Sequence, residues 1–224
     1  MRDRLIAELG DLPHQRALVY LMGPYEAFDV DAVVDSAGDE DGRGADAIPE
    51  SVDFGRLVGT DVDLDQQEAT LDLLLDVRDR LRTDPGVNAF LAIDVDVPLE
   101  EMDAATQSIR FALASNVVVY VVPRIGDNLG VGIEVGSVLE AIYRHDEGTG
   151  AATDSVGDNH GERVVFVHEE GVRSAMIAAV SDRWDARIYS YEDRMDLVKQ
   201  VRLFVRDVLG RERYGDLSSL DEVD

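Results

Sequence analysis

The sequence predicts an α/β fold, in which a parallel β-sheet is covered by helices on both faces. Two observations carry this prediction. Short apolar segments alternate five times with longer segments of helical periodicity, and such alternation is typical of parallel sheets. The run VVVYVV at 117–122 is unbroken and rich in β-branched residues, as expected for a strand that is buried on both faces.

The predicted strands are short, and the first three end at clear turn signals. ALVYLM ends at Gly23-Pro24, VNAFLAI ends at the polar stretch that begins with Asp94, and VVVYVV ends at Pro123. Glycine and proline after an apolar run mark the end of a strand. The predicted strands cover residues 17–22, 87–93, 117–122, 163–168 and 186–191.

The predicted helices carry apolar residues at three- and four-residue spacing. Val135, Val138, Leu139 and Ile142 are one example, and this spacing gives a helix one apolar face that can cover a sheet. Helices are expected at residues 66–82, 99–114, from the glycine-rich stretch to about 143, 172–181 and 192–209.

The pattern as a whole indicates one domain, residues 1–213, with a flavodoxin-like or Rossmann-like three-layer fold and strand order 2-1-3-4-5. An acidic loop or insertion at about 30–65, with a short hairpin near 52–58, interrupts it. Residues 144–162 are expected to form a loop, and the acidic tail 214–224 to be disordered.

Composition adds a prediction about habitat rather than activity. Asp and Glu total 47 against 21 Lys and Arg, the net charge is −26, and Lys199 is the only lysine. An acidic, lysine-poor chain with a full apolar core is typical of proteins that work in concentrated salt, which screens the repulsion between surface carboxylates. The alternative is a protein with basic partners, but the acids are spread along the whole chain rather than grouped.

Several classes of function are disfavoured by what the sequence lacks. It has no cysteine, so neither disulfides nor thiolate chemistry is available. Its four histidines are scattered without metal-ligand spacing, and no basic stripe suggests nucleic acid as a partner. No apolar run has the length of a membrane span or signal core, so we expect a cytoplasmic protein. We expect neither a metal nor a cofactor.

Ligands of such sheets bind beyond the carboxyl ends of the strands, where the strand order reverses. The polar and glycine residues that follow the first three predicted strands are therefore the candidate site. The candidate substrate-binding residues are Gly23, Pro24, Tyr25, Asp94, Asp127, Asn128, Gly130 and Gly132.

The stretch IGDNLGVGIEVG at 125–136 is the most unusual part of this set. Its glycine spacing is one residue longer than the dinucleotide-binding fingerprint, and it follows the third strand rather than the first. Free backbone N–H groups at a helix start favour anions, but Glu134 would repel an anion bound close to it. Glu134 therefore favours a neutral or cationic centre, such as a sugar carbon that develops positive charge. The alternative is a first-turn acid stabilised by the helix dipole, and Asp94 and Asp127 can likewise be solvated surface acids.

Three segments together resemble the nucleoside 2-deoxyribosyltransferase-like superfamily: YLMGPY at 20–25, Ser115-Asn116 before the third strand, and GVGIEVG at 130–136. The resemblance implies that Glu134 is the nucleophile that attacks the anomeric carbon and expels the base. It further implies that Asp127 or Asn128 contacts the substrate and that residues 23–25 line the nucleoside pocket.

The chain departs from the family pattern at several positions. Val131 replaces a threonine, Asn116 replaces an aspartate, and Gln107 and Ser108 stand where the family carries a further acid. The expected function is cleavage or exchange of an N-glycosidic bond in a nucleoside or nucleotide. The alternative is a non-catalytic nucleotide-binding or regulatory module. The expected partner is that small molecule, with a homo-oligomer as a further expectation.

Overall fold

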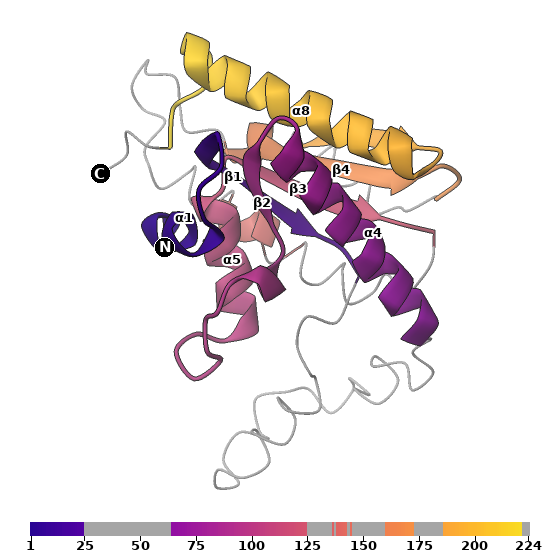
Figure 1. Cartoon of the computed structure of the whole chain (residues 1–224), viewed down its shortest axis with the longest axis horizontal. Coiled ribbons are helices and arrows are strands. Elements are labelled where there is room, and N and C mark those ends of the chain that lie inside the picture. Colours follow the sequence, from indigo (N-terminus) through magenta and orange to yellow (C-terminus); the bar gives the residue numbers. More distant parts are fainter. Residues whose placement is uncertain are drawn as a thin grey trace, which may run out of the picture.

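The computed structural model describes residues 1–24, 64–124, 136, 138–142, 144, 160–172 and 186–220. At its centre lies a five-stranded sheet of order β2-β1-β3-β4-β5 in which all neighbours are parallel (Figure 1). The strands are β1 (His14–Met22), β2 (Val87–Phe90), β3 (Val117–Val122), β4 (Val164–Glu169) and β5 (Arg187–Tyr191). The predicted α/β fold class and the predicted strand order 2-1-3-4-5 are thus confirmed.

Helices cover both faces of this sheet. On one face lie α4 (Leu64–Thr83) and α8 (Arg194–Tyr214), and on the other α1 (Arg2–Leu9) and α5 (Ala104–Ala114) (Figure 1). The helical residues 138–142 pack on the α5 face. The three layers follow from apolar strands that have no polar face to turn towards water.

The alternation of side chains along β1 shows how the two cores are divided. Leu18, Tyr20 and Met22 face α5, whereas Val19 and Leu21 face α4 and α8. Every residue of β3 is buried, because β3 lies between β1 and β4 and under helices on both sides. The unbroken apolar run therefore occupies the centre of the sheet, as its sequence predicts.

Some element boundaries differ from the prediction for local reasons. The helix expected from residue 99 begins at Ala104, because the Asp103 carboxylate accepts a hydrogen bond from the Thr106 N–H at 2.9 Å and caps the helix there. The second strand ends at Phe90, and a short 3-10 helix (η2, Ala92–Asp94) follows it. The last helix extends to Tyr214 and ends at Gly215, whose φ of 80° is left-handed.

The segment 214–224 was expected to be disordered, but its first part is ordered. Leu217 is only 2% exposed, and the Ser218 carbonyl accepts a hydrogen bond from Arg163. An apolar side chain and a buried cation thus hold this stretch to the sheet, which its acidic composition does not reveal. Three predicted segments lie outside the described residues: the insertion up to residue 63, the helix from residue 173, and the end of the tail at 221–224.

Candidate functional site

The described helical segments that follow β1 and β3, two neighbouring strands, lie on opposite faces of the sheet. Helix α4, the next described element after β1, packs on one face, and the helical residues 138–142 after β3 pack on the other. This divergence is the topological switch point at which open α/β sheets bind ligands. Its described borders are Gly23 and Pro24 after β1 and Arg124 after β3.

Only some predicted site residues belong to the described part of the chain. Gly23, Pro24 and Asp94 are described, and all three lie just beyond the carboxyl ends of β1 and β2. The other predicted residues lie outside it: Tyr25, Asp127, Asn128, Gly130, Gly132 and Glu134.

Gly23 has a packing reason to be glycine. A Cβ at this position would lie 3.0 Å from a methyl carbon of Leu74 on α4 and 3.3 Å from the Val121 carbonyl oxygen of β3. Contacts this short require the neighbours to shift, and the backbone carbonyl of a central strand has little room to move. The glycine therefore lets α4 pack tightly against the end of β1, on one side of the switch point.

Asp94 is fully used by groups of its own chain. One carboxylate oxygen accepts a hydrogen bond from the Leu91 N–H at 2.9 Å, and the other is ion-paired with Arg78. Arg82 lies 3.8 Å away, and its own Nε donates to the Ala89 carbonyl of the edge strand β2 at 2.7 Å. Burial lowers the pKa of Arg82, while the charge of Asp94 raises it. With its side chain only 15% exposed, Asp94 closes the turn after β2 and joins that turn to α4.

The ends of β3 and β4 are joined by Arg124, whose role the sequence did not indicate. Its backbone N–H donates to the Glu169 carboxylate at 2.9 Å, and its guanidinium donates to the Glu170 carbonyl. The guanidinium lies over Gly171, where a Cβ would be only 2.4 Å from Nη2. The positive φ of 86° favours glycine at 171, and two hydrogen bonds hold Arg124 at the border of the switch point.

Tyr191 at the end of β5 is a second residue of this edge that sequence reasoning missed. It is 4% exposed, and its hydroxyl has no hydrogen-bond partner among the described residues. Burial, assisted by the charge of Glu169, raises the pKa of Tyr191 far above its ordinary value. Both effects disfavour the charged phenolate.

The positions where the resembled family carries a further acid have structural roles here. The Gln107 amide donates to the Val97 and Met102 carbonyls at 3.0 and 2.7 Å and so fixes the loop before α5. The Ser108 hydroxyl lies 3.3 Å from the Tyr20 hydroxyl, in a buried position under β1. Neither side chain can supply a proton as a carboxylic acid would.

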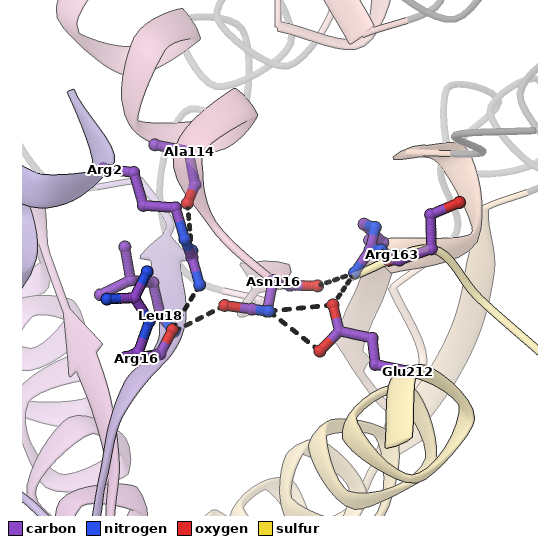
Figure 2. A network of polar contacts seen from close by, with 8 residues as sticks. Arg2, Arg16, Leu18, Ala114, Asn116, Arg163 and Glu212 are labelled. Carbon is purple, nitrogen blue, oxygen red and sulfur yellow. Dashed lines mark hydrogen bonds and ion pairs between the residues drawn. The ribbon is translucent and has the colours of Figure 1, made fainter. Parts of the chain in front are cut away.

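Asn116, the third departure from the family pattern, lies directly before β3, at the amino-terminal end of this strand, and Figure 2 shows its polar contacts. Its side-chain oxygen accepts the Leu18 N–H at 2.9 Å, and its amide donates to both carboxylate oxygens of Glu212 at 2.9 and 3.0 Å. Arg163, buried beside them, is ion-paired with Glu212. Asn116 lies at the amino-terminal end of β3, whereas the switch point lies at the carboxyl ends of the strands. Its replacement of an aspartate therefore serves packing and not chemistry at the switch point.

Two kinds of feature are absent from the described residues. No group of three or more His, Asp or Glu side chains there is placed to hold a metal ion. No helix among the described segments is long and apolar enough to cross a membrane.

Comparison with known proteins gives a family but no activity. No curated protein shows significant similarity to the chain. The family described as a domain of unknown function, DUF7509, matches residues 2–221. Since this match spans nearly the whole chain, the protein belongs to the DUF7509 family.

Proposed function

We propose that the protein cleaves or exchanges the N-glycosidic bond of a nucleoside or nucleotide bound at the switch point between β1 and β3. The observation that carries the proposal is the divergence of the chain after these two adjacent strands. The glycine-rich stretch with Glu134 begins directly after Arg124, at the end of β3. Residues 20–25 and 130–136 resemble the sequences of deoxyribosyltransferases, and this resemblance supports the same location for the proposed site.

The proposed chemistry needs one carboxylate and no cofactor. Glu134 would attack the anomeric carbon, and the bond from that carbon to the base nitrogen would break with its electron pair leaving on the base. The base takes up a proton, and the glycosyl ester on Glu134 is then released by water or by a second base. A carboxylate suits this step because it stabilises the positive charge that develops on the sugar.

A non-catalytic nucleotide-binding or regulatory module is the second candidate, and a specific observation favours it. Two described carboxylates at this end of the sheet are engaged within the chain, since Asp94 is paired with Arg78 and Glu169 accepts from the Arg124 N–H. Neither is free to protonate a leaving base. On this alternative the switch point binds a nucleotide without turnover.

The deciding experiment incubates the protein in multimolar KCl with a panel of nucleosides and nucleotides and measures free base by chromatography. The wild type should release base from at least one member, and Glu134→Gln should not. Glu140→Gln is the matched control, because it makes the same chemical change in a described helical residue whose carboxylate pairs with Arg144. Absence of release, or equal release by Glu134→Gln, would contradict the catalytic proposal.

Thermal unfolding of the same samples separates the two candidates. A rise in melting temperature with a nucleotide, without release of base, identifies the binding module. If no nucleoside or nucleotide raises the melting temperature, both candidates are excluded.

A further inference from the structure

The outer face of α8 exposes large apolar side chains. Six large apolar side chains are exposed in the described part of the chain, and three of them are on this helix. Met195 is 60%, Leu203 54% and Tyr214 80% exposed. The helix lies along the outside of the α4 face, and its outer side is turned away from the sheet (Figure 1). A group of exposed apolar residues on one element is a feature of interaction surfaces.

This face is also basic in a strongly acidic protein. Helix α8 contains six basic and three acidic residues, a net charge of +3, whereas the whole chain has −26. On its exposed positions the imbalance is the same: four cations (Arg194, Lys199, Arg206 and Arg213) against Asp207. The only lysine of the sequence is among them. The exposed residues of α8 thus carry a net positive charge in an acidic chain, and Asp72 and Asp84 of neighbouring segments pair with Arg194 and Arg206.

Three of the cations and two of the three exposed apolar side chains occupy separate flanks of the helix, whereas Met195 falls on the flank of the cations. Successive residues of an α-helix are rotated by about 100°. Lys199, Arg206 and Arg213 therefore follow one flank of the outer face, and Leu203 and Tyr214 follow the other. We name these five residues, with Gly210 between the two flanks, the α8 stripe.

Gly210 is the second, independent observation. It lies inside a helix, where glycine costs about 1 kcal/mol relative to alanine. A Cβ at this position would meet nothing within 4 Å, so the packing of the described residues gives no reason for a glycine here. At the middle of an exposed stripe, a glycine allows the backbone of a partner helix to approach closely.

We propose that the α8 stripe is a docking surface for an acidic amphipathic helix of another protein. The leucine and tyrosine would pack against the apolar face of that helix, and the three cations would pair with carboxylates on its flank. Two of the cations have exposed pairs within the chain, Arg206 with Asp84 at 2.8 Å and Lys199 with Asp196 at 4.0 Å. Exposed pairs contribute so little to stability that a partner carboxylate can share or replace them.

Two other occupants fit the stripe less well. A second copy that docked through the same stripe would set cations against cations, which disfavours association. Nucleic acid would satisfy the cations, but its phosphate backbone offers nothing to Leu203 and Tyr214, and the net charge of −26 repels it.

The test uses a synthetic amphipathic helix, with leucine along one face and glutamate on both flanks, carrying a fluorescent label. Its binding to the full chain is measured by anisotropy in KCl at a concentration that screens long-range charge. A second peptide with lysine for glutamate is the ligand control. We expect the acidic peptide to bind at least about tenfold more tightly than the basic one.

Matched variants locate the binding. The triple variant Lys199→Glu, Arg206→Glu, Arg213→Glu should weaken the binding of the acidic peptide by at least about tenfold. The same charge change at Arg80, Arg110 and Arg144, on other elements, should leave the dissociation constant of the acidic peptide within about twofold of the wild-type value. Leu203→Ser should weaken the binding of the acidic peptide, whereas Leu99→Ser, at another exposed leucine, should not.

Gly210→Leu separates docking from folding. Because the space around Gly210 is open, this change should maintain or raise the melting temperature. It should nevertheless weaken the binding of the acidic peptide, because the leucine side chain blocks the close approach of the peptide backbone. Equal binding of the two peptides, absence of saturable binding, or insensitivity to the stripe variants would overturn the proposal. So would self-association that Leu203→Ser abolishes, or tighter binding of a single-stranded oligonucleotide.

Discussion

At the scale of single residues, the structure assigns packing roles to side chains whose types suggest chemistry. Asn116 is the clearest case, because its amide group uses both ends, as acceptor from the Leu18 N–H and as donor to Glu212. An aspartate could not donate to Glu212, so the asparagine is required by its neighbour. Asp94 is similar, with both oxygens used inside the chain.

Asn116→Asp should destabilise the protein. The new carboxylate would face the Glu212 carboxylate at hydrogen-bond distance in a nearly buried position, and we expect a loss of about 1–3 kcal/mol in the free energy of unfolding. Urea titration at fixed KCl measures it. Combining Asn116→Asp with Glu212→Gln, which leaves one carboxylate for Arg163, should recover part of the loss. Unchanged stability in the single variant would contradict the assigned role.

Gly171→Ala should cost more stability than Gly215→Ala. Both glycines have a similar positive φ, +86° and +80°, but a Cβ meets Arg124 at 171 and nothing within 4 Å at 215. An alanine at a left-handed position costs about 1–2 kcal/mol, so the difference between the two variants reports the contact with Arg124. Adding Arg124→Ala to Gly171→Ala should bring its urea midpoint close to that of Gly215→Ala. Equal midpoints for the two single variants would show that Arg124 moves aside freely.

At the scale of elements, the starts of α5 and α8 are determined by capping aspartates more than by apolar periodicity. The apolar pattern extends the helix before β3 back to residue 99, yet α5 begins only where the Asp103 carboxylate accepts hydrogen bonds from the Thr106 N–H and hydroxyl. Asp193 caps α8 in the same way. Boundaries therefore depend on a single side chain, while the existence of each helix depends on its whole apolar face.

The Asp103 cap should give α5 a pH dependence. The hydrogen bonds from the Thr106 hydroxyl and N–H lower the pKa of Asp103 below its ordinary value. Its stabilising contribution is therefore present above the unfolded pKa of about 3.9 and is lost as the pH falls through the lower, folded pKa. Asp103→Asn keeps a capping oxygen but does not titrate.

The measurement is the melting-temperature difference between the wild type and Asp103→Asn from pH 7 down to the acid limit of folding. The advantage of the wild type should be constant above pH 5 and shrink below pH 4, about the ordinary aspartate value. Asp11→Asn, which removes a carboxylate from a segment outside any helix, is the control. A difference that does not change with pH would mean that the cap works without its charge.

At the scale of the whole molecule, the net charge of −26 predicts that stability depends on salt. Exposed ion pairs such as Arg206–Asp84 and Arg194–Asp72 neutralise few of these acids. The repulsion between the remaining carboxylates extends about 10 Å at 0.1 M salt and about 3 Å at 1 M. We propose that the protein works in concentrated salt.

The urea midpoint should accordingly rise steadily as KCl increases from 0.1 to 3 M, as screening extends to shorter distances. Sucrose at matched osmolality is the control, since it favours the compact state by exclusion but does not screen charge. A midpoint that is independent of KCl, or that rises equally in sucrose, would contradict the proposal.

The candidate site was predictable in position but only partly in detail. Strand periodicity and the turn signal Gly23-Pro24 place these residues at the carboxyl edge of β1, and the structure confirms that placement. The partners of Asp94 were not predictable, because Arg78 and Arg82 come from a helix whose rotation against the sheet depends on packing. Nor was the contact between Arg124 and Gly171, since no local pattern links the ends of β3 and β4.

By itself, the sequence determined the layers and the order of the strands. Burial on both faces requires unbroken apolar runs such as 117–122, and short alternating elements leave few topologies. Only the tertiary structure decided which polar residues are structural. Asn116 and Glu212 are 96 residues apart in sequence, and the two edges of the sheet are distinguished only once the strands are aligned. The same holds for α8, whose basic and apolar outer face is visible only after its inner face has been buried.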